Sequence, residues 1–166
     1  MSRSSSSVPS SAPSATGPYS AMPRLRLVTV EQVSAVAEGP TLSTPSEVRT
    51  ELHRYFEFKD REHFVVLHLD GAHRVTTFEV VSVGILNATQ VHPREVFKSA
   101  ILANAAAIIC AHNHPSGNLT PSAEDRRVFE RLTAAGELLG IRLLDFVIVA
   151  GAEYWSAEEH GTWPPS

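Results

Sequence analysis

From residue 44 onward, apolar positions recur along the chain with two different periods. Apolar residues three and four positions apart indicate helices, whereas short runs rich in β-branched and aromatic residues indicate strands. In chain order, these patterns predict a helix over 45–56, a hairpin of strands over 63–70 and 74–83, a helix over 93–106, a strand over 106–114, a helix over 123–139 and a strand over 141–151. This order is typical of a mixed α/β fold in which helices pack on a central sheet.

The boundaries of these elements carry their own sequence signals. Thr44 and Glu47 match a capping box, with Pro45 at the first helical position, so we expect a helix to begin there. Gly71 lies in a polar turn between the hairpin strands, and Gly140 follows the long helix where a C-cap is expected. The apolar positions assigned to the three helix faces are Val48, Leu52 and Phe56; Val96, Ala100 and Ile101; and Val128, Leu132, Ala135 and Leu139.

The stretch before residue 44 has a different composition. Residues 1–21 contain nine serines and three prolines and almost no side chain that could be buried, so they cannot offset the entropy of ordering. Residues 22–43 are more apolar but have no sustained period. We therefore expect a disordered or poorly structured N-terminal tail over 1–43 and one folded domain over 44–166.

Composition narrows the class of protein. A chain of 166 residues with 43% hydrophobic and 19% charged residues is typical of a single soluble domain. The net charge of −4 argues against a protein that coats nucleic acid, because phosphate contacts require a basic face. The single Cys110 excludes an internal disulfide. No apolar run is long enough for a membrane span or a signal peptide, so we expect a cytoplasmic protein without membrane contact.

The segment HNHPSGNLTPSAED joins a predicted strand to a predicted helix. On a strand, His112 and His114 project to the same side, where two imidazoles can hold a divalent ion such as zinc. Pro115 and Gly117 end the strand, which leaves this site at the strand end. Asp125, eleven residues after His114, stands in the first turn of the following helix and can supply a third ligand if that helix packs back across the turn.

Three protein ligands leave a fourth tetrahedral position for water, which is the arrangement of catalytic rather than structural zinc. Bound zinc lowers the pKa of water to about 7, so a hydroxide nucleophile forms at neutral pH. Such chemistry also needs a general base and a donor to the oxyanion. Ser122 is placed for the second task, and the base has to come from elsewhere in the fold.

Each of these residues also has an ordinary structural explanation. The two histidines could be a hydrogen-bonded pair at a strand end. Ser122 and Asp125 match a capping box, which stabilises a helix without any metal; one aspartate can serve both purposes. Cys110 shares the face of His112 and could be a thiolate ligand, but its apolar surroundings favour an inert buried thiol.

A run of arginines follows the motif on the same predicted helix. Arg126, Arg127 and Arg131 could contact an acidic substrate or a nucleic acid. A solvated helix face is the more common explanation for such a run.

The full spacing, His-x-His-Pro, six residues, then Ser-x-x-Asp, matches the signature of the JAMM metalloproteases, the MPN-domain group that includes deubiquitinating isopeptidases. With VHPREVFKSAILANAAAIICAHNHPSG in front of it, the chain resembles the bacterial RadC family over about residues 45–161. This family is often labelled as DNA-repair proteins. The resemblance implies that residues 44–166 form an MPN/JAMM-like, cytidine-deaminase-like domain with a mixed sheet and a metal-dependent hydrolase site.

The resemblance also implies roles for individual residues. His112, His114 and Asp125 would bind Zn²⁺, and Ser122 would help to hold the water or the oxyanion. JAMM enzymes use a glutamate at the head of an early strand, in a pattern like E-V-x-G-x-L. The matching position is Glu62, before HFVVLHLD, although the glycine is absent. We assign Glu62 as the general base, with Glu79 and Glu95 as alternatives.

The chain departs from RadC relatives at two places near the motif. It has GILN at residues 84–87 where relatives commonly have GTLN, and LDF at 144–146 where they have LDH. Neither change affects an expected ligand, but Phe146 cannot take a polar role beside the site. Longer members also carry an N-terminal helix-hairpin-helix segment, and residues 1–44 contain no counterpart, which weakens the expectation of a DNA role.

Three functions follow as hypotheses. The first is a zinc-dependent hydrolase that cleaves an amide, peptide or isopeptide bond of a peptide or protein substrate. The second is a nucleic-acid-processing or DNA-binding protein, as the RadC label suggests. The contiguous letters HNH do not support it, since the three residues are not contiguous in nucleases of that name. The third is an inert MPN-like scaffold, which the complete ligand set disfavours; assembly as a homodimer remains open.

Overall fold

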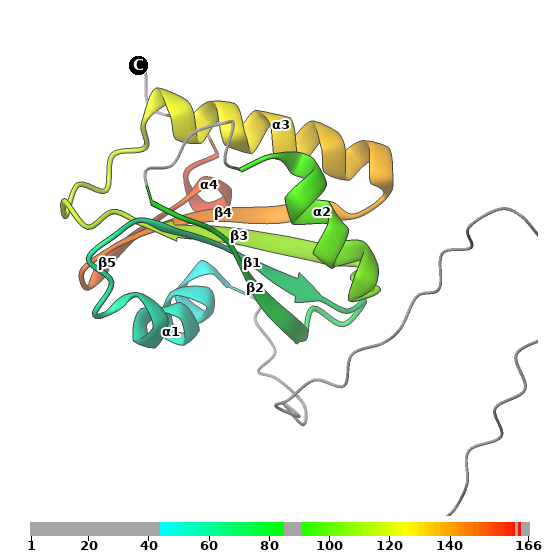
Figure 1. The fold of residues 1–166 in the computed structure, drawn as a ribbon, viewed down its shortest axis with the longest axis horizontal. Helices are drawn as coiled ribbons and strands as arrows, with labels where there is room; N and C mark the ends of the chain where they lie inside the picture. Colours follow the sequence, from blue (N-terminus) through cyan, green and yellow to red (C-terminus); the bar gives the residue numbers. More distant parts are fainter. Residues whose placement is uncertain (1–43, 85–90, 162, 164–166) are drawn as a thin grey trace, which may run out of the picture. The chain divides into compact units, whose positions relative to one another are not determined.

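A computed structural model describes residues 44–84, 91–161 and 163 of the chain. Its helices are α1 (Pro45–Phe56), α2 (Pro93–Leu102), α3 (Ala123–Leu139) and α4 (Ala157–His160). Its strands are β1 (His63–Leu69), β2 (Val75–Val83), β3 (Ala107–Asn113), β4 (Arg142–Ala150) and β5 (Glu153–Ser156). The strands form one mixed sheet in the order β2-β1-β3-β4-β5, as Figure 1 shows. The predicted tail over 1–43 lies outside the described residues.

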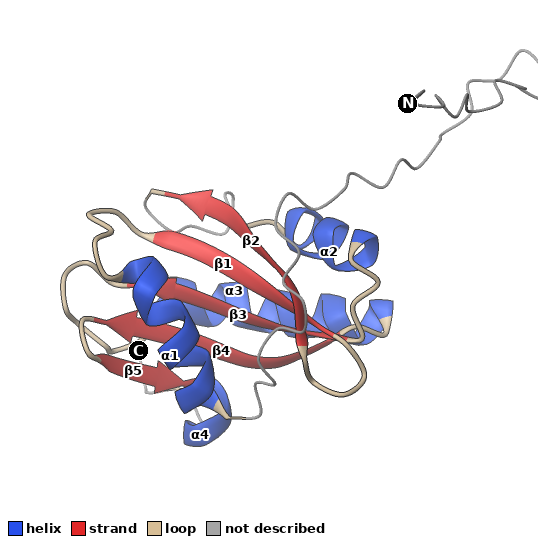
Figure 2. Cartoon of the chain, turned by 90° about the horizontal axis from the view of Figure 1, so that it is seen from below, coloured by secondary structure: helices blue, strands red, loops and turns tan. Residues whose placement is uncertain are grey.

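Helices cover both faces of this sheet. The helices α2 and α3 lie on one face, and α1 lies on the other (Figures 1 and 2). Alternate residues of the central strands supply the two cores: Phe64, Val66, Ile108, Cys110, Phe146 and Ile148 face α2 and α3, whereas Val65, Leu67, Ile109, Ala111, Val147 and Val149 face α1. The predicted mixed α/β fold, with an MPN-like sheet flanked by helices, is therefore confirmed.

The strand β3 is the centre of the sheet. It pairs antiparallel with β1 and parallel with β4, and the parallel pair is connected through α3. All seven residues of β3 are buried, as expected for a strand covered on both faces. In such a strand–helix–strand unit, polar side chains that follow the first strand gather beside the start of the helix, where ligands usually bind.

The helix α1 follows its sequence signals closely. Thr44 accepts a hydrogen bond from the Glu47 backbone, and the Glu47 carboxylate accepts one from the Thr44 backbone, which completes the predicted capping box. Val48, Leu52 and Phe56 are all buried against the sheet. The long helix α3 ends as predicted too, because Gly140 adopts the left-handed conformation with φ of 70°.

Three details of the helix predictions are wrong. The helix α2 ends at Leu102 rather than near residue 106, because Asn104 takes a positive φ of 54° and turns the chain into β3. Ile101 was expected on its buried face but is 58% exposed, while Phe97 is buried instead. Leu139, expected on the buried face of α3, is likewise half exposed at the last residue of the helix.

The sequence patterns also missed β5 and α4, so β4 is not the last strand of the sheet. Both elements are only four residues long. Buried Asp145 holds them in place: its carboxylate accepts hydrogen bonds from the Ser156 hydroxyl and from the Glu158 backbone. Within the described part of the chain, no helix combines the length and the apolar character needed to cross a membrane.

Candidate metal centre

Four polar side chains from three separate segments meet at one end of β3. His112 is on β3 and His114 directly follows it, while Asp125 lies in the first turn of α3. Glu62 immediately precedes β1, and the pairing of Phe64 with His112 brings it beside the histidines. One ligand atom from each of the four residues lies within 4.8 Å of the others.

The distances between these atoms are compatible with a metal ligand set, and the two shortest also fit direct hydrogen bonds between the side chains. His112 Nε2 lies 3.0 Å from His114 Nε2 and 3.1 Å from Asp125 Oδ1, and His114 Nε2 lies 3.7 Å from Asp125 Oδ2. Ligands about 2.0 to 2.1 Å from a tetrahedral zinc ion lie roughly 3.3 Å from each other. Glu62 Oε1 is slightly farther away, 3.7 Å and 3.9 Å from the two histidine nitrogens, beside the set rather than within it.

The orientation of His114 leaves the right nitrogen available. Its Nδ1 donates a hydrogen bond to the backbone carbonyl of Asn118, and a carbonyl oxygen can only accept. The neutral ring therefore carries its lone pair on Nε2, which points into the cluster. Metal-binding histidines are commonly oriented in this way through their second nitrogen.

Asp125 combines helix capping with a place in the cluster. Its Oδ2 accepts hydrogen bonds of 2.6 Å from both the backbone and the hydroxyl of Ser122, while Oδ1 faces His112. Burial by itself would raise the pKa of the Asp125 carboxyl, but the hydrogen bond and charge of His112 and the hydrogen bonds from Ser122 outweigh it and lower the pKa to about 2. The group is thus a carboxylate at neutral pH, as a metal ligand must be.

Ser122 is the N-cap of α3, and its hydroxyl proton is directed at Asp125. In this arrangement Ser122 fixes the orientation of the carboxylate. Donation to an oxyanion, the role expected from the sequence, requires the hydroxyl to release Asp125 first. That role stays a prediction.

The surroundings of His112 are apolar. The side chain is 0% exposed, stacks on Phe64 at 6.1 Å between ring centroids and meets the edge of Phe146 at 5.4 Å. Its Nδ1 has no hydrogen-bond partner among the described residues. Phe146 therefore supplies an apolar ring beside His112, as expected from the sequence.

The other residues considered from the sequence do not belong to the cluster: the alternative general bases Glu79 and Glu95 and the alternative ligand Cys110. Glu95 is on α2 and forms an ion pair of 2.6 Å with Lys98. Glu79 is on the edge strand β2, where it pairs with Val66 near the middle of β1, away from the cluster. Cys110 is fully buried, and burial raises the pKa of its thiol far above the usual value, so it stays protonated and matches the predicted inert thiol.

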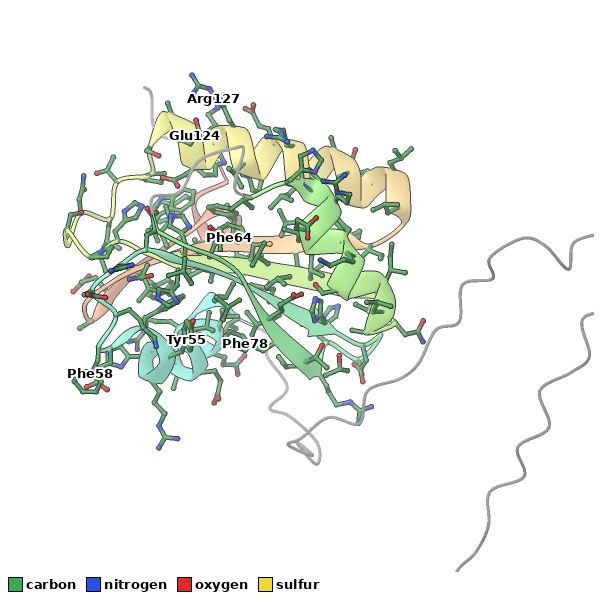
Figure 3. The ribbon with its side chains drawn as sticks, viewed as in Figure 1. Tyr55, Phe58, Phe64, Phe78, Glu124 and Arg127 are labelled. Carbon is green, nitrogen blue, oxygen red and sulfur yellow. The ribbon has the colours of Figure 1, made fainter. Side chains whose placement is uncertain are left out.

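The arginines of α3 form surface ion pairs. Arg126 contacts Glu130 and Arg127 contacts Glu124, each at 2.9 Å, and the second pair is labelled in Figure 3. The two arginine side chains are half to two-thirds exposed. The pairs favour the explanation of a solvated helix face over a dedicated anion site.

The sequence patterns missed two asparagines near the cluster. The Asn118 carbonyl orients His114, but it is a backbone group that no residue pattern marks. Asn113 stands between the two histidines and therefore faces the opposite side of β3, where its amide bonds to the backbone of residues 61 and 63. Strand periodicity assigns Asn113 to the α1 face, but only the pairing of β1 with β3 reveals those contacts.

A mixed sheet with this topology, carrying a His-x-His pair and an aspartate at one end of its central strand, defines a JAB-type domain of the MPN fold. Comparison with protein families gives the narrower assignment: the model of the RadC-like JAB domain matches residues 42–162. The chain belongs to the RadC family.

Curated relatives agree with this assignment. The chain is 49% identical over 122 residues to a UPF0758 protein of Rubrobacter xylanophilus, which covers 74% of this chain and 53% of the relative. It is 44% identical over 120 residues to a UPF0758 protein of Methanosarcina mazei, covering 72% and 52%, and 45% identical over 119 residues to one of Histophilus somni, covering 72% and 54%. The chain thus spans about half the length of the curated relatives it matches.

Proposed function

We propose that this protein is a zinc-dependent hydrolase that cleaves an amide bond, either peptide or isopeptide, in a peptide or protein substrate. The observation that carries the proposal is the convergence of His112, His114 and Asp125 on one point, with Glu62 beside them. A capping box explains Asp125 and Ser122 alone, but it does not require two imidazole nitrogens to face the same carboxylate.

The donor set suits Zn²⁺, which prefers imidazole nitrogen and carboxylate oxygen in four-coordinate sites. His112 and His114 would each bind it through Nε2, and Asp125 through Oδ1. When bound there, zinc supplies an activated water at neutral pH and polarises the substrate carbonyl.

Glu62 is suited to move the proton in this reaction. Its side chain is 19% exposed, so water and substrate can reach it, and its Oε1 lies within 4 Å of both histidine nitrogens. In the proposed reaction, the carboxylate accepts the proton of the attacking water and then delivers it to the nitrogen of the leaving amine. A positioned general base and acid of this kind contributes about 10²- to 10⁴-fold to the rate.

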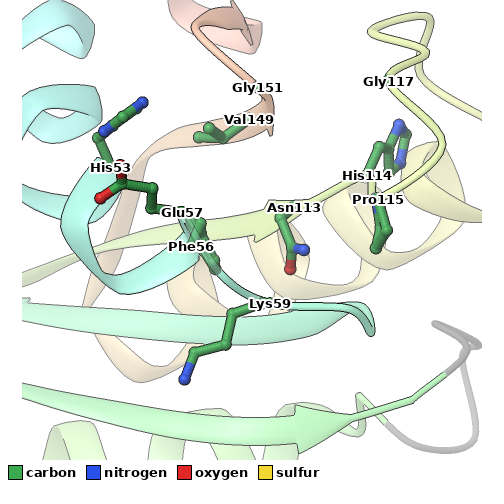
Figure 4. A pocket seen from close by; sticks show the side chains of 10 residues that line it. All are labelled: His53, Phe56, Glu57, Lys59, Asn113, His114, Pro115, Gly117, Val149 and Gly151. Carbon is green, nitrogen blue, oxygen red and sulfur yellow. The ribbon is translucent and has the colours of Figure 1, made fainter.

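A hollow beside the cluster offers room for part of a substrate. It has a volume of about 300 Å³, with Asn113 and His114 on one side and Phe56 and Lys59 near the end of α1 on the other. Figure 4 shows this hollow, with His114 and Pro115 at its edge. His114 is the proposed zinc ligand that lines this hollow, so a substrate segment bound there would reach the proposed site beside His114.

Metal analysis tests the binding half of the proposal. The purified protein is expected to retain about one zinc per chain, as three-ligand catalytic sites do, while His112→Ala and Asp125→Ala lose it. Because Asp125→Ala also removes a helix cap, Thr44→Ala is the matched control: it breaks the equivalent capping box of α1 and should retain zinc. Full zinc content in both cluster variants would refute the assignment.

A peptide-library cleavage screen tests the chemical half. Wild-type protein is expected to cleave at least one amide bond, and Glu62→Gln should retain zinc while its rate falls by about 10²-fold or more, because the amide cannot accept the proton. Glu95→Gln is the matched control for a surface glutamate. Equal cleavage by wild type and Glu62→Gln would exclude Glu62 as the base.

A further inference from the structure

The residue between the two histidines makes a pair of contacts that ligand binding does not require. The Asn113 side chain is 5% exposed and projects from β3 on the face opposite to His112. Its Oδ1 accepts a hydrogen bond of 2.7 Å from the backbone N–H of His63. Its Nδ2 donates one of 3.0 Å to the backbone carbonyl of Arg61.

These two hydrogen bonds lie on either side of Glu62. A third, of 2.8 Å, runs from the Gly84 backbone to the carbonyl of Glu62 itself. Glu62 stands just outside β1, which begins at His63, and the nearest pair between β1 and β3 is Phe64 with His112. The hydrogen bonds on both neighbours of Glu62 therefore help to fix the direction in which its side chain leaves the backbone.

We propose that Asn113 is a positioning residue that holds Glu62 at its working distance from the metal ligands. This inference rests on the proposed function, because it assigns a purpose to the position of the base. Asn113 is covalently continuous with His112 and His114, so its amide makes the ligand strand and the segment of the base one rigid unit. Figure 4 shows Asn113 and His114 together at the end of β3. A misplacement of about 1 Å can reduce a catalysed rate by about 10²-fold.

Hydrogen exchange tests the contact without any need for activity. In wild-type protein, the amide of His63 is expected to be protected, and in Asn113→Ala it should exchange about tenfold faster, the effect of losing one buried hydrogen bond. Ile109→Ala, on the same strand and face, creates a cavity away from residues 61–63 and should leave that amide protected. An unprotected His63 amide in the wild type would overturn the proposal.

A double-mutant cycle separates positioning from a merely structural role. Each protein is loaded with Co²⁺, and its visible spectrum is followed against pH. We expect Glu62→Gln to shift the pH midpoint of the spectral change. Asn113→Ala should shift this midpoint in the same direction, and the double variant should match Glu62→Gln alone. A wild-type midpoint in Asn113→Ala, or an equal shift in both backgrounds, would contradict the proposal.

Two further outcomes remain informative. If Asn113→Ala does not fold, Asn113→Asp keeps the acceptor for His63 and loses only the donor to Arg61, and it should give a shift between those of wild type and Glu62→Gln. No shift in that variant counts against positioning. Failure of wild-type protein to bind Co²⁺ refutes the proposed function, whereas the exchange of the His63 amide still decides whether Asn113 holds this segment.

Discussion

His68 is a buried histidine on β1 that lies outside the proposed site. Its Nδ1 is 2.6 Å from the Thr77 hydroxyl and its Nε2 is 3.0 Å from the Ser99 hydroxyl, so the ring links β1 to β2 and to α2. Burial lowers the pKa of His68 below the usual value, and the nearby charge of Glu79 opposes this only in part. The folded protein therefore favours the neutral ring.

This burial predicts a pH dependence of stability. Because the folded-state pKa of His68 is lowered, its contribution is fully present above the unfolded pKa of about 6.5 and is lost as the pH falls through the folded value. In urea unfolding at pH 7.5 and pH 5, wild type should lose more stability on acidification than His68→Gln. His73→Asn, in the exposed turn, controls for removal of a surface histidine. Identical pH profiles of His68→Gln and wild type would contradict this.

At the residue scale, the sequence predicted the residues of the cluster better than it predicted the residues that orient them. The strand period places His112 and His114 on one side of β3, but the approach of Asp125 depends on how α3 packs and was implied by the resemblance to JAMM enzymes. The Asn113 amide bonds to the backbone of a segment far earlier in the chain, and the Asn118 carbonyl is a backbone group that accepts from the His114 ring. The first contact depends on strand register, which a single sequence does not define, and the second on the shape of the loop after β3.

Gly136 shows an element-scale constraint that the sequence conceals. It lies in the interior of α3, where glycine usually costs about 1 kcal/mol relative to alanine. A Cβ built there would approach the Ile141 carbonyl to 2.6 Å and the Phe97 ring to 3.3 Å. The absence of a side chain lets α3 pack closely on the turn into β4 and on α2.

Gly136→Ala is therefore expected to destabilise the protein, by about 1 to 3 kcal/mol, because overpacking against backbone outweighs the gain in helix propensity. Exposed Ala134→Gly is the comparison in the same helix and should cost only about 1 kcal/mol. Thermal unfolding of both variants measures the difference. A higher melting temperature for Gly136→Ala would contradict this prediction and would mean that the turn after α3 moves to make room for the added methyl group.

The elements themselves were predictable where the pattern was long. The capped α1, the hairpin and α3 have clear periods and end signals, whereas β5 and α4 are four residues each and owe their place to Asp145. Four residues give too short a window for periodicity, and a buried carboxylate that caps a later helix is a tertiary contact. The early end of α2 has the same origin, since Asn104 adopts positive φ to start β3.

At the scale of the whole domain, the proposed metal connects three segments that are far apart in sequence. Glu62 precedes β1, the histidines end β3, and Asp125 begins α3. The β1–β3–α3 junction therefore contains four groups whose mutual arrangement a bound cation would fix. A ligand that binds the folded state but not the unfolded state raises the free energy of unfolding by mass action.

Zinc should accordingly stabilise the protein against heat. With free zinc at 100 times its dissociation constant, the gain is about 2.7 kcal/mol, which corresponds to a rise in melting temperature of roughly 10 °C. A chelator should reverse it, and His112→Ala/His114→Ala should show no response to either. A zinc-dependent rise of the same size in that double variant would place the binding elsewhere.

The two oxygens of Asp125 face different partners, and this division affects how the motif can change among relatives. Oδ2 secures the start of α3 through Ser122, a benefit that persists in a protein without any metal. The paired imidazoles of His112 and His114 have no comparable second use, and one of them is buried against phenylalanine rings. If the proposed metal site were lost during evolution, selection for a stable start of α3 would therefore retain the aspartate after the histidines had changed. In a divergent relative, an intact His-x-His pair is then a better indicator of the proposed metal site than the aspartate.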